Sequence, residues 1–268
     1  MYCDFYKQKL IITKMKYIIR ISLVMTLLAV VFTSCKKKEY QQDEDSILTK
    51  ANIEGAVILY DEFGNKDAQT GMLVYLEKGG DATNFSGETE KDGMFLITNA
   101  LYNPSYYVVY QKQGYGTYKI PYEHKYTGST GVIGETPSLS RISTTHVHSL
   151  NVQQSGNNVE FDVAYSGSSQ KGQRYIRFIF SSSSSINHDS FSYLSPKEAV
   201  SGGSESFAYS KEELMEMGLK SGEEYWVQAY GDAFKSNYYF DEYQLKKVLP
   251  NLGYASENST PKTKFLMP

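Results

Sequence analysis

Cysteine, tryptophan and positive charge are scarce in this chain of 268 residues, which has two cysteines, one tryptophan and a net charge of −3. The two cysteines, Cys3 and Cys35, leave almost nothing from which disulfides or a thiolate site could be built. The excess of acidic residues argues against nucleic acid as a partner, because phosphate contacts need clustered lysine and arginine.

The common motifs of catalytic and metal sites are also missing. The chain has no H-E-x-x-H, no G-x-S-x-G, no phosphate-binding glycine loop and no calcium-loop pattern. His146 and His148 would project to one face of a strand, but a zinc site needs at least three protein ligands, so we favour a structural role for them. We predict no catalytic residue, no metal and no cofactor. An enzyme remains only as a remote alternative, a hydrolase whose carboxylates cannot be placed.

The longest apolar run, residues 21–32, follows Lys14, Lys16 and Arg20. A membrane-spanning helix needs roughly 20 apolar residues, so this shorter run indicates an export signal, which we place at residues 15–34. Met15 begins a stretch of normal signal-peptide length. Residues 1–14 are therefore interpreted as a mis-called start, and Cys3 would be lost with them.

The signal ends in Phe32-Thr33-Ser34-Cys35, which resembles a bacterial lipobox. The resemblance implies that Cys35 becomes the lipidated first residue of the mature chain and anchors it to a membrane. An ordinary secretory signal with an incidental cysteine is the alternative. Residues 1–34 contain five of the 27 Lys and Arg and one of the 30 Asp and Glu, so the mature chain has 22 basic and 29 acidic residues, a net charge of about −7.

Residues 35–50 are polar and are predicted to be a lipidated tether. Their acidic "QQDED" resembles the surface-export signals of Bacteroidetes lipoproteins, and "DSI" at 45–47 resembles the O-glycosylation motif of that phylum. A plain polar linker is an equal alternative for these short matches. The predicted location is the outer membrane, exposed at the cell surface, with the periplasmic face as the alternative.

From Ala51 the sequence changes to short alternating or β-branched runs separated by Gly, Asn and Asp, which predicts an all-β fold. Residues 51–125 resemble the carboxypeptidase regulatory-like domain, a transthyretin-like sandwich. The resemblance is carried by "GAV" at 55–57, "VYL" at 74–76, "DGMFLI" at 92–97 and "GY" at 114–115. It implies an accessory β-sandwich and no activity.

A Gly/Ser/Thr/Pro-rich stretch at 126–138 is predicted to be a linker, and a second β-sandwich is predicted over 139–268. The spacing of Leu219, Gly222 and Tyr225 resembles the tyrosine corner of fibronectin type III domains, which implies a buried Tyr225 with a bonded hydroxyl. Two departures from that family are a short helical turn in "KEELMEMGL" and a long loop at 234–261. Long loops of this kind are usually functional or disordered.

Tyrosine is abundant, with 24 residues, eight of them between positions 101 and 126. If Tyr225, Val227 and Ala229 face the core, strand alternation turns their neighbours outward. We therefore predict an aromatic platform for a ligand or partner, which tyrosines at 238, 239 and 243 and Phe240 could extend. The alternative, which we favour, is that the long loop folds over this face and buries it. The platform residues are Tyr175, Arg177, Trp226, Gln228 and Tyr230.

The sequence thus predicts a membrane-anchored, non-catalytic binding or adhesion module of two tandem β-sandwiches, with glycan as a candidate ligand. The main alternative is a structural subunit of an outer-membrane uptake or fimbria-like complex, in which the aromatic face would contact an outer-membrane protein.

Overall fold

The computed structural model describes residues 50–125, 129–167, 172–253 and 261–268. The predicted start at 1–14, the signal peptide, Cys35 and the tether up to residue 49 lie outside the described residues. In the described ranges, no helix is both long enough and apolar enough to cross a membrane.

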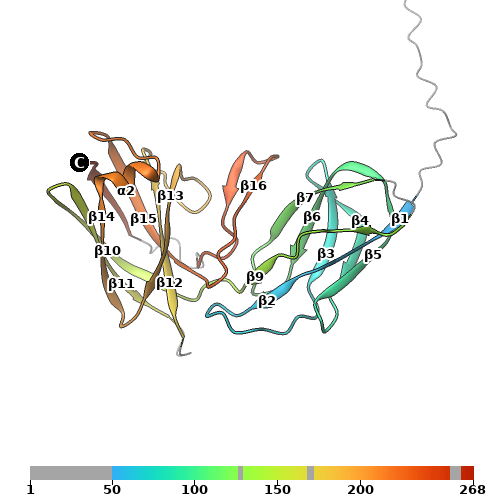
Figure 1. Ribbon diagram of the computed structural model, residues 1–268. Helices are drawn as coiled ribbons and strands as arrows, with labels where there is room; N and C mark the ends of the chain where they lie inside the picture. The colour runs from blue at the N-terminus through green and yellow to red at the C-terminus, as the bar shows by residue number, and fades with distance from the viewer. Residues whose placement is uncertain (1–49, 126–128, 168–171, 254–260) are drawn as a thin grey trace, which may run out of the picture. The chain divides into compact units, whose positions relative to one another are not determined.

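The described chain folds into two β-sandwiches in tandem, whose strands can be followed in Figure 1. The first sandwich has a four-stranded sheet in the order β4-β3-β6-β7 and a three-stranded sheet in the order β5-β1-β8, with β2 and β9 forming a further parallel pair. Its strands are β1 (Lys50–Ala56), β2 (Ile58–Tyr60), β3 (Leu73–Lys78), β4 (Asp81–Glu88), β5 (Met94–Leu101), β6 (Asn103–Gln111), β7 (Tyr118–His124), β8 (Gly131–Val132) and β9 (Ser138–Ser140).

Alternation along these strands builds the core of the first sandwich. Leu76 of β3, Ile97 of β5 and Val108 of β6 point between the sheets and are fully buried in one cluster. Burial of such side chains contributes roughly 1.5–3 kcal/mol each, which favours this register over one shifted by a residue.

The predicted linker at 126–138 and the second-domain start at 139 need correction. Strand β8 pairs with β1, and β9 pairs with β2, so the first sandwich extends to Ser140. Ile133 and Leu139 are buried in its core. The glycine, serine and threonine of this stretch are typical of a linker, but two apolar side chains suffice to hold such short strands against the core.

The second sandwich pairs a three-stranded sheet, β10-β11-β14, with a four-stranded sheet, β13-β12-β15-β18. Phe161, Phe178 and Val227 are fully buried between the sheets. Its strands are β10 (His146–Ser155), β11 (Asn158–Ser166), β12 (Arg174–Ser181), β13 (Tyr193–Val200), β14 (Ser204–Ser210), β15 (Glu224–Asp232) and β18 (Lys262–Leu266).

The predicted helical turn before the corner is present as α2 (Lys211–Glu216). The Ser210 side chain accepts a hydrogen bond from the Glu213 N–H at 3.2 Å, and the Glu213 carboxylate accepts one from the Ser210 N–H at 2.8 Å. Because so short a helix is marginal alone, this capping box and the burial of Leu214 stabilise it.

The long connection between β15 and β18 contains a two-stranded hairpin, β16 (Tyr239–Asp241) and β17 (Lys246–Val248). We call residues 238–248 the aromatic hairpin. The segment after it continues as far as Gly253 in the described residues.

Candidate functional site

The predicted platform is mostly covered. Tyr230 and Gln228 do lie on the face of β15 opposite the core, as alternation requires, but each is only 1% exposed. Tyr230 packs in a cluster with Leu249 and Leu252, which follow the aromatic hairpin in the chain. The face is covered, as in the favoured alternative, because the long loop supplies the apolar side chains that pack on Tyr230.

The other platform residues are held by contacts within the protein. The Arg177 guanidinium donates to the Asp232 carboxylate at 2.7 Å, the Ser195 carbonyl at 2.8 Å and the Ser236 hydroxyl at 3.0 Å. Tyr175 is half-buried with the Lys197 ammonium 4.3 Å from the centre of its ring. Trp226 is half-buried against the Tyr230 cluster.

The corner residues lie together at the start of β15. Tyr225 is 1% exposed, and its hydroxyl accepts a hydrogen bond from the Lys220 N–H at 3.1 Å and donates one to the Glu223 carboxylate at 2.8 Å. Leu219 is buried beside it in the core. Gly222 has φ = +78°, a conformation that glycine adopts without a steric penalty. This is the bonding that a tyrosine corner requires.

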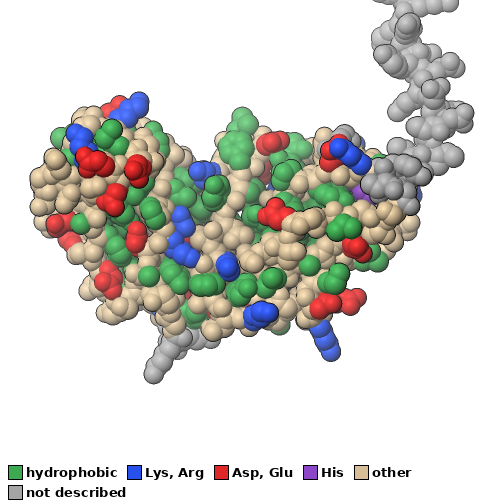
Figure 2. All heavy atoms as spheres, viewed as in Figure 1, with side chains coloured by type: hydrophobic (Ala, Val, Ile, Leu, Met, Phe, Trp, Pro, Cys, Tyr) green, Lys and Arg blue, Asp and Glu red, His purple; other side chains and the backbone are tan. Residues whose placement is uncertain are grey.

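The exposed aromatic surface lies instead on the aromatic hairpin. Tyr238 is 59% exposed, Phe240 53% and Tyr243 47%, and the aliphatic Leu245 is 76% exposed. Figure 2 shows hydrophobic side chains, coloured green, at the surface in the region where Figure 1 labels β16. An exposed apolar surface of this kind, within eight residues, is typical of a site that binds a ligand or a protein partner.

The turn of the hairpin is rigidly built. The Asp241 carboxylate accepts hydrogen bonds from the N–H groups of Tyr243 and Gln244, both at 3.0 Å. Leu245 has φ = +51°, a left-handed conformation that is uncommon for any residue other than glycine. Such strain persists only where the surrounding structure over-determines it, and it concentrates at functional positions.

An ion-paired cluster fixes the hairpin to the first sandwich. The Lys119 ammonium of β7 lies 2.8 Å from the Glu77 carboxylate of β3 and 3.4 Å from the Asp241 carboxylate of β16. Although burial opposes ionisation, the Gln244 N–H and the Lys119 charge hold the pKa of the Asp241 carboxyl below its usual value. The rings of Tyr118 and Tyr239 meet edge to face beside this cluster, with centroids 5.9 Å apart.

Where the hairpin meets β6 and β7 there is a groove of about 360 Å³, which we call the tyrosine groove. This volume lies at the small end of the range typical of ligand sites. The Tyr107 and Tyr243 rings meet edge to face in it, with centroids 5.9 Å apart, and the Tyr243 hydroxyl accepts the Gly79 N–H at 3.0 Å. The groove is lined by Ser105, Tyr106, Tyr107, Pro121, Tyr122, Glu123, Glu242 and Tyr243.

The groove is apolar at its base and acidic at its edge. Tyr107 is buried, whereas Pro121, Glu123 and Glu242 are exposed. Burial, and after it a hydrogen bond to the Glu242 carboxylate, raises the pKa of Tyr107 to about 12. Tyr107 therefore stays neutral across the physiological pH range, while the two glutamates offer acceptor oxygens to whatever occupies the groove.

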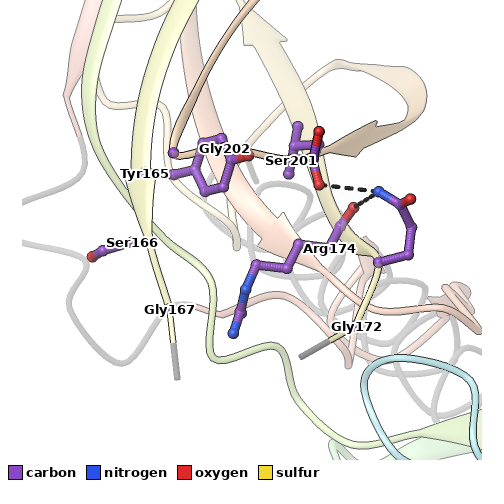
Figure 3. A pocket seen from close by; sticks show the side chains of 10 residues that line it. Tyr165, Ser166, Gly167, Gly172, Arg174, Ser201 and Gly202 are labelled. Carbon is purple, nitrogen blue, oxygen red and sulfur yellow. Dashed lines mark hydrogen bonds between the residues drawn. The ribbon is translucent and has the colours of Figure 1, made fainter. Parts of the chain in front are cut away.

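A second hollow, of about 530 Å³, lies at the end of the second sandwich (Figure 3). Its polar groups are used by the protein itself. The Arg174 guanidinium donates to the Thr145 hydroxyl at 3.0 Å and lies 5.2 Å from the centre of the Phe63 ring, and the Gln173 amide donates to two backbone carbonyls. Tyr165 is 6% exposed and presents little of its ring. We therefore place the candidate site at the tyrosine groove.

No ligating cluster of three or more His, Cys, Asp or Glu side chains occurs among the described residues. The rings of His146 and His148 have centroids 6.3 Å apart.

The sequence pointed to Tyr243 as an extension of the platform and to Tyr107 only as a strand residue in the resemblance to the carboxypeptidase regulatory-like domain, and it gave no role to Glu123 or Glu242. The signal that could have found Tyr107 is the tyrosine density of residues 101–126, which lies in the strands that form the groove wall, and no sequence pattern points to Glu123 or Glu242. Nothing in the local pattern shows that a loop more than 100 residues later would complete the groove.

No family model matches this chain, and no curated protein matches it. Among solved structures it is similar to one described as "a putative carbohydrate binding protein" from Bacteroides uniformis, with 14% identity, 81% of this chain and 99% of that chain covered, and a TM-score of 0.31.

Two DUF3823 family proteins are also similar. The one from Bacteroides ovatus has 12% identity, covers 76% of this chain and 96% of its own, and gives a TM-score of 0.27. The one from Parabacteroides merdae has 8% identity, corresponding coverages of 76% and 97%, and the same TM-score.

Proposed function

We propose that this protein is a membrane-anchored, non-catalytic glycan-binding module that holds a sugar chain in the tyrosine groove. The observation that carries the proposal is the half-exposed Tyr243 ring, fixed by a hydrogen bond and an aromatic contact and flanked by the Glu123 and Glu242 carboxylates.

The chemistry of this arrangement suits a sugar. Sugar rings present apolar C–H faces that pack against a flat aromatic ring, while their hydroxyls need hydrogen-bond acceptors at the edge of the contact. Tyr243 and Pro121 supply apolar surface, and Glu123, Glu242 and the Ser105 hydroxyl supply polar groups around it. Because Tyr243 is already immobilised in the free protein, binding would lose little side-chain entropy there.

The anchor is part of the same proposal. A lipid on Cys35, followed by a polar tether, would hold the two sandwiches at the outer membrane, facing the cell surface. We further propose that the first sandwich is a carboxypeptidase regulatory-like domain and the second a fibronectin type III-like domain. The three-plus-four strand arrangement of each sandwich and the bonded Tyr225 support these assignments.

A structural subunit is the second candidate, and one observation favours it. Phe240 and Leu245 present apolar side chains that offer no hydrogen bonds to a sugar but would suit a protein partner. Residues of this kind anchor interfaces when they insert into a pocket of the partner.

The test is native electrophoresis of the full chain, solubilised in a neutral detergent, through gels that contain single polysaccharides, both neutral and acidic. We expect at least one polymer to retard the wild type. Tyr243→Ala should abolish the retardation, whereas Tyr243→Phe, which keeps the ring, should preserve it. Tyr238→Ala is the matched control, because Tyr238 is exposed but lies outside the groove.

Two results would contradict glycan binding. One is a wild type that no polymer retards. The other is a Tyr243→Ala variant that migrates like the wild type while its thermal unfolding is unchanged. If retardation is absent and Phe240→Ala instead removes a co-purifying outer-membrane protein, the structural-subunit alternative is correct.

A further inference from the structure

The charges around the tyrosine groove indicate which class of glycan it can bind. Glu123 and Glu242 both line the groove and both are exposed. The described residues that line it include no lysine or arginine. A ligand that enters therefore meets two negative charges and no cation among those residues.

The cations near the groove are already engaged. Lys119 lies between the Glu77 and Asp241 carboxylates and is largely buried, so its charge is balanced within the protein. Lys125 is not part of the groove lining, and its ammonium lies 2.6 Å from the Glu123 carboxylate. Neither lysine supplies a positive site for a ligand carboxylate or sulfate.

We infer that the tyrosine groove selects neutral glycans over glycans that carry carboxylate or sulfate groups. This inference rests on the proposed function and specifies its ligand class. Like charges a few ångströms apart repel, by an amount that water and salt reduce at exposed carboxylates, and the net charge of about −7 on the mature chain acts in the same direction at longer range. The glutamate oxygens accept hydrogen bonds from neutral hydroxyls and find no such donor in an ionised carboxylate.

The experiment compares two forms of one polymer. A neutral polysaccharide that retards the full-length wild type is oxidised at its primary alcohols to uronates, so that the two forms share a backbone and differ in charge. We expect the oxidised form to bind at least about tenfold more weakly at low salt, and we expect added salt to narrow the difference.

Substitutions test whether the groove carboxylates cause the weaker binding of the oxidised polymer. Glu123→Gln and Glu242→Gln keep an acceptor oxygen and remove a charge. The double variant is expected to bind the neutral polymer more weakly than the wild type, because both side chains are proposed to contact the sugar, but the ratio of its affinities for the neutral and the oxidised form should fall toward one. Glu216→Gln makes the same charge change on α2, which does not line the groove, and should leave the ratio of the two affinities at its wild-type value.

The outcomes separate the two proposals. If the wild type binds acidic polymers as well as neutral ones or better, and Tyr243→Ala still abolishes binding, the selectivity inference is wrong while the proposed function stands. If the wild type prefers the neutral polymer and the Glu123→Gln/Glu242→Gln double variant keeps that preference in full, the groove carboxylates are not its cause and the inference fails. If no polymer binds, the inference falls together with the proposed function.

Discussion

At the scale of single residues, Tyr225 and Trp226 are adjacent in β15 but lie on opposite faces of the sheet. Tyr225 lies between the sheets of the second sandwich, where its ring meets that of Tyr193 edge to face with centroids 5.9 Å apart. Trp226 lies on the other face and is half-buried against the cluster that contains Leu249 and Leu252. Their different burial follows from the alternation of side chains along a strand.

Tyr225→Ala is expected to destabilise the protein by about 3–5 kcal/mol, because it removes a buried aromatic ring and leaves a cavity. Tyr225→Phe keeps the ring and removes only the corner hydrogen bonds, so it should cost about 1 kcal/mol. Denaturant unfolding measures both values. A harmless Tyr225→Ala together with a strongly damaging Trp226→Ala would mean that the two faces of β15 are reversed.

The sequence was sufficient to predict which side chains of β15 point toward the core, because alternation is local. Alternation alone was not sufficient to predict which outward side chains stay exposed. Tyr230 and Gln228 face away from the core and are nevertheless buried, because Leu249 and Leu252 come from a segment about 20 residues later. The exposure of a side chain depends on which other segments pack over its face of the sheet, and the alternation along one strand contains no information about those segments.

At the scale of elements, the aromatic hairpin positions the candidate site. It holds Tyr243 and Glu242 against the strands that carry Tyr107 and Glu123. The charged contact that fixes it joins Lys119 to Asp241, 122 residues apart in the sequence. The length of the long loop predicted only that it is functional or disordered, and its docking position depends on tertiary contacts that leave no periodic signal in the sequence.

Lys119→Met is expected to destabilise the protein by about 3 kcal/mol, because it leaves the Glu77 carboxylate buried without its cation. Adding Glu77→Met should recover most of the loss, since an apolar pair of similar volume replaces the ion pair, and the Asp241 carboxylate keeps its backbone N–H partners. Thermal unfolding of the single and double variants measures the recovery. A double variant no more stable than Lys119→Met would show that the cluster does not fix the hairpin in this way.

At the scale of the whole molecule, two sandwiches follow a predicted lipid anchor. The all-β fold was predictable because alternating runs and glycine turns recur along residues 51–268. The boundary between the sandwiches was not, because β8 and β9 are two and three residues long and lie in a sequence typical of a linker.

Cys35→Ala is expected to release the protein from the membrane fraction or to leave its signal uncleaved, because the substitution removes the proposed lipid attachment site. Cell fractionation and metabolic labelling with a fatty-acid analogue measure this, and Cys3→Ala, within the proposed mis-called start, should change neither result. A wild-type chain that carries no lipid would contradict the anchor.

The most direct measurement of the central claim is a crystal structure of the protein with an oligosaccharide cut from the polymer that retards it most. The account predicts a sugar ring packed on Tyr243, with hydroxyls within hydrogen-bond distance of Glu123 or Glu242. A sugar bound elsewhere, with the tyrosine groove empty at a saturating ligand concentration, would contradict it.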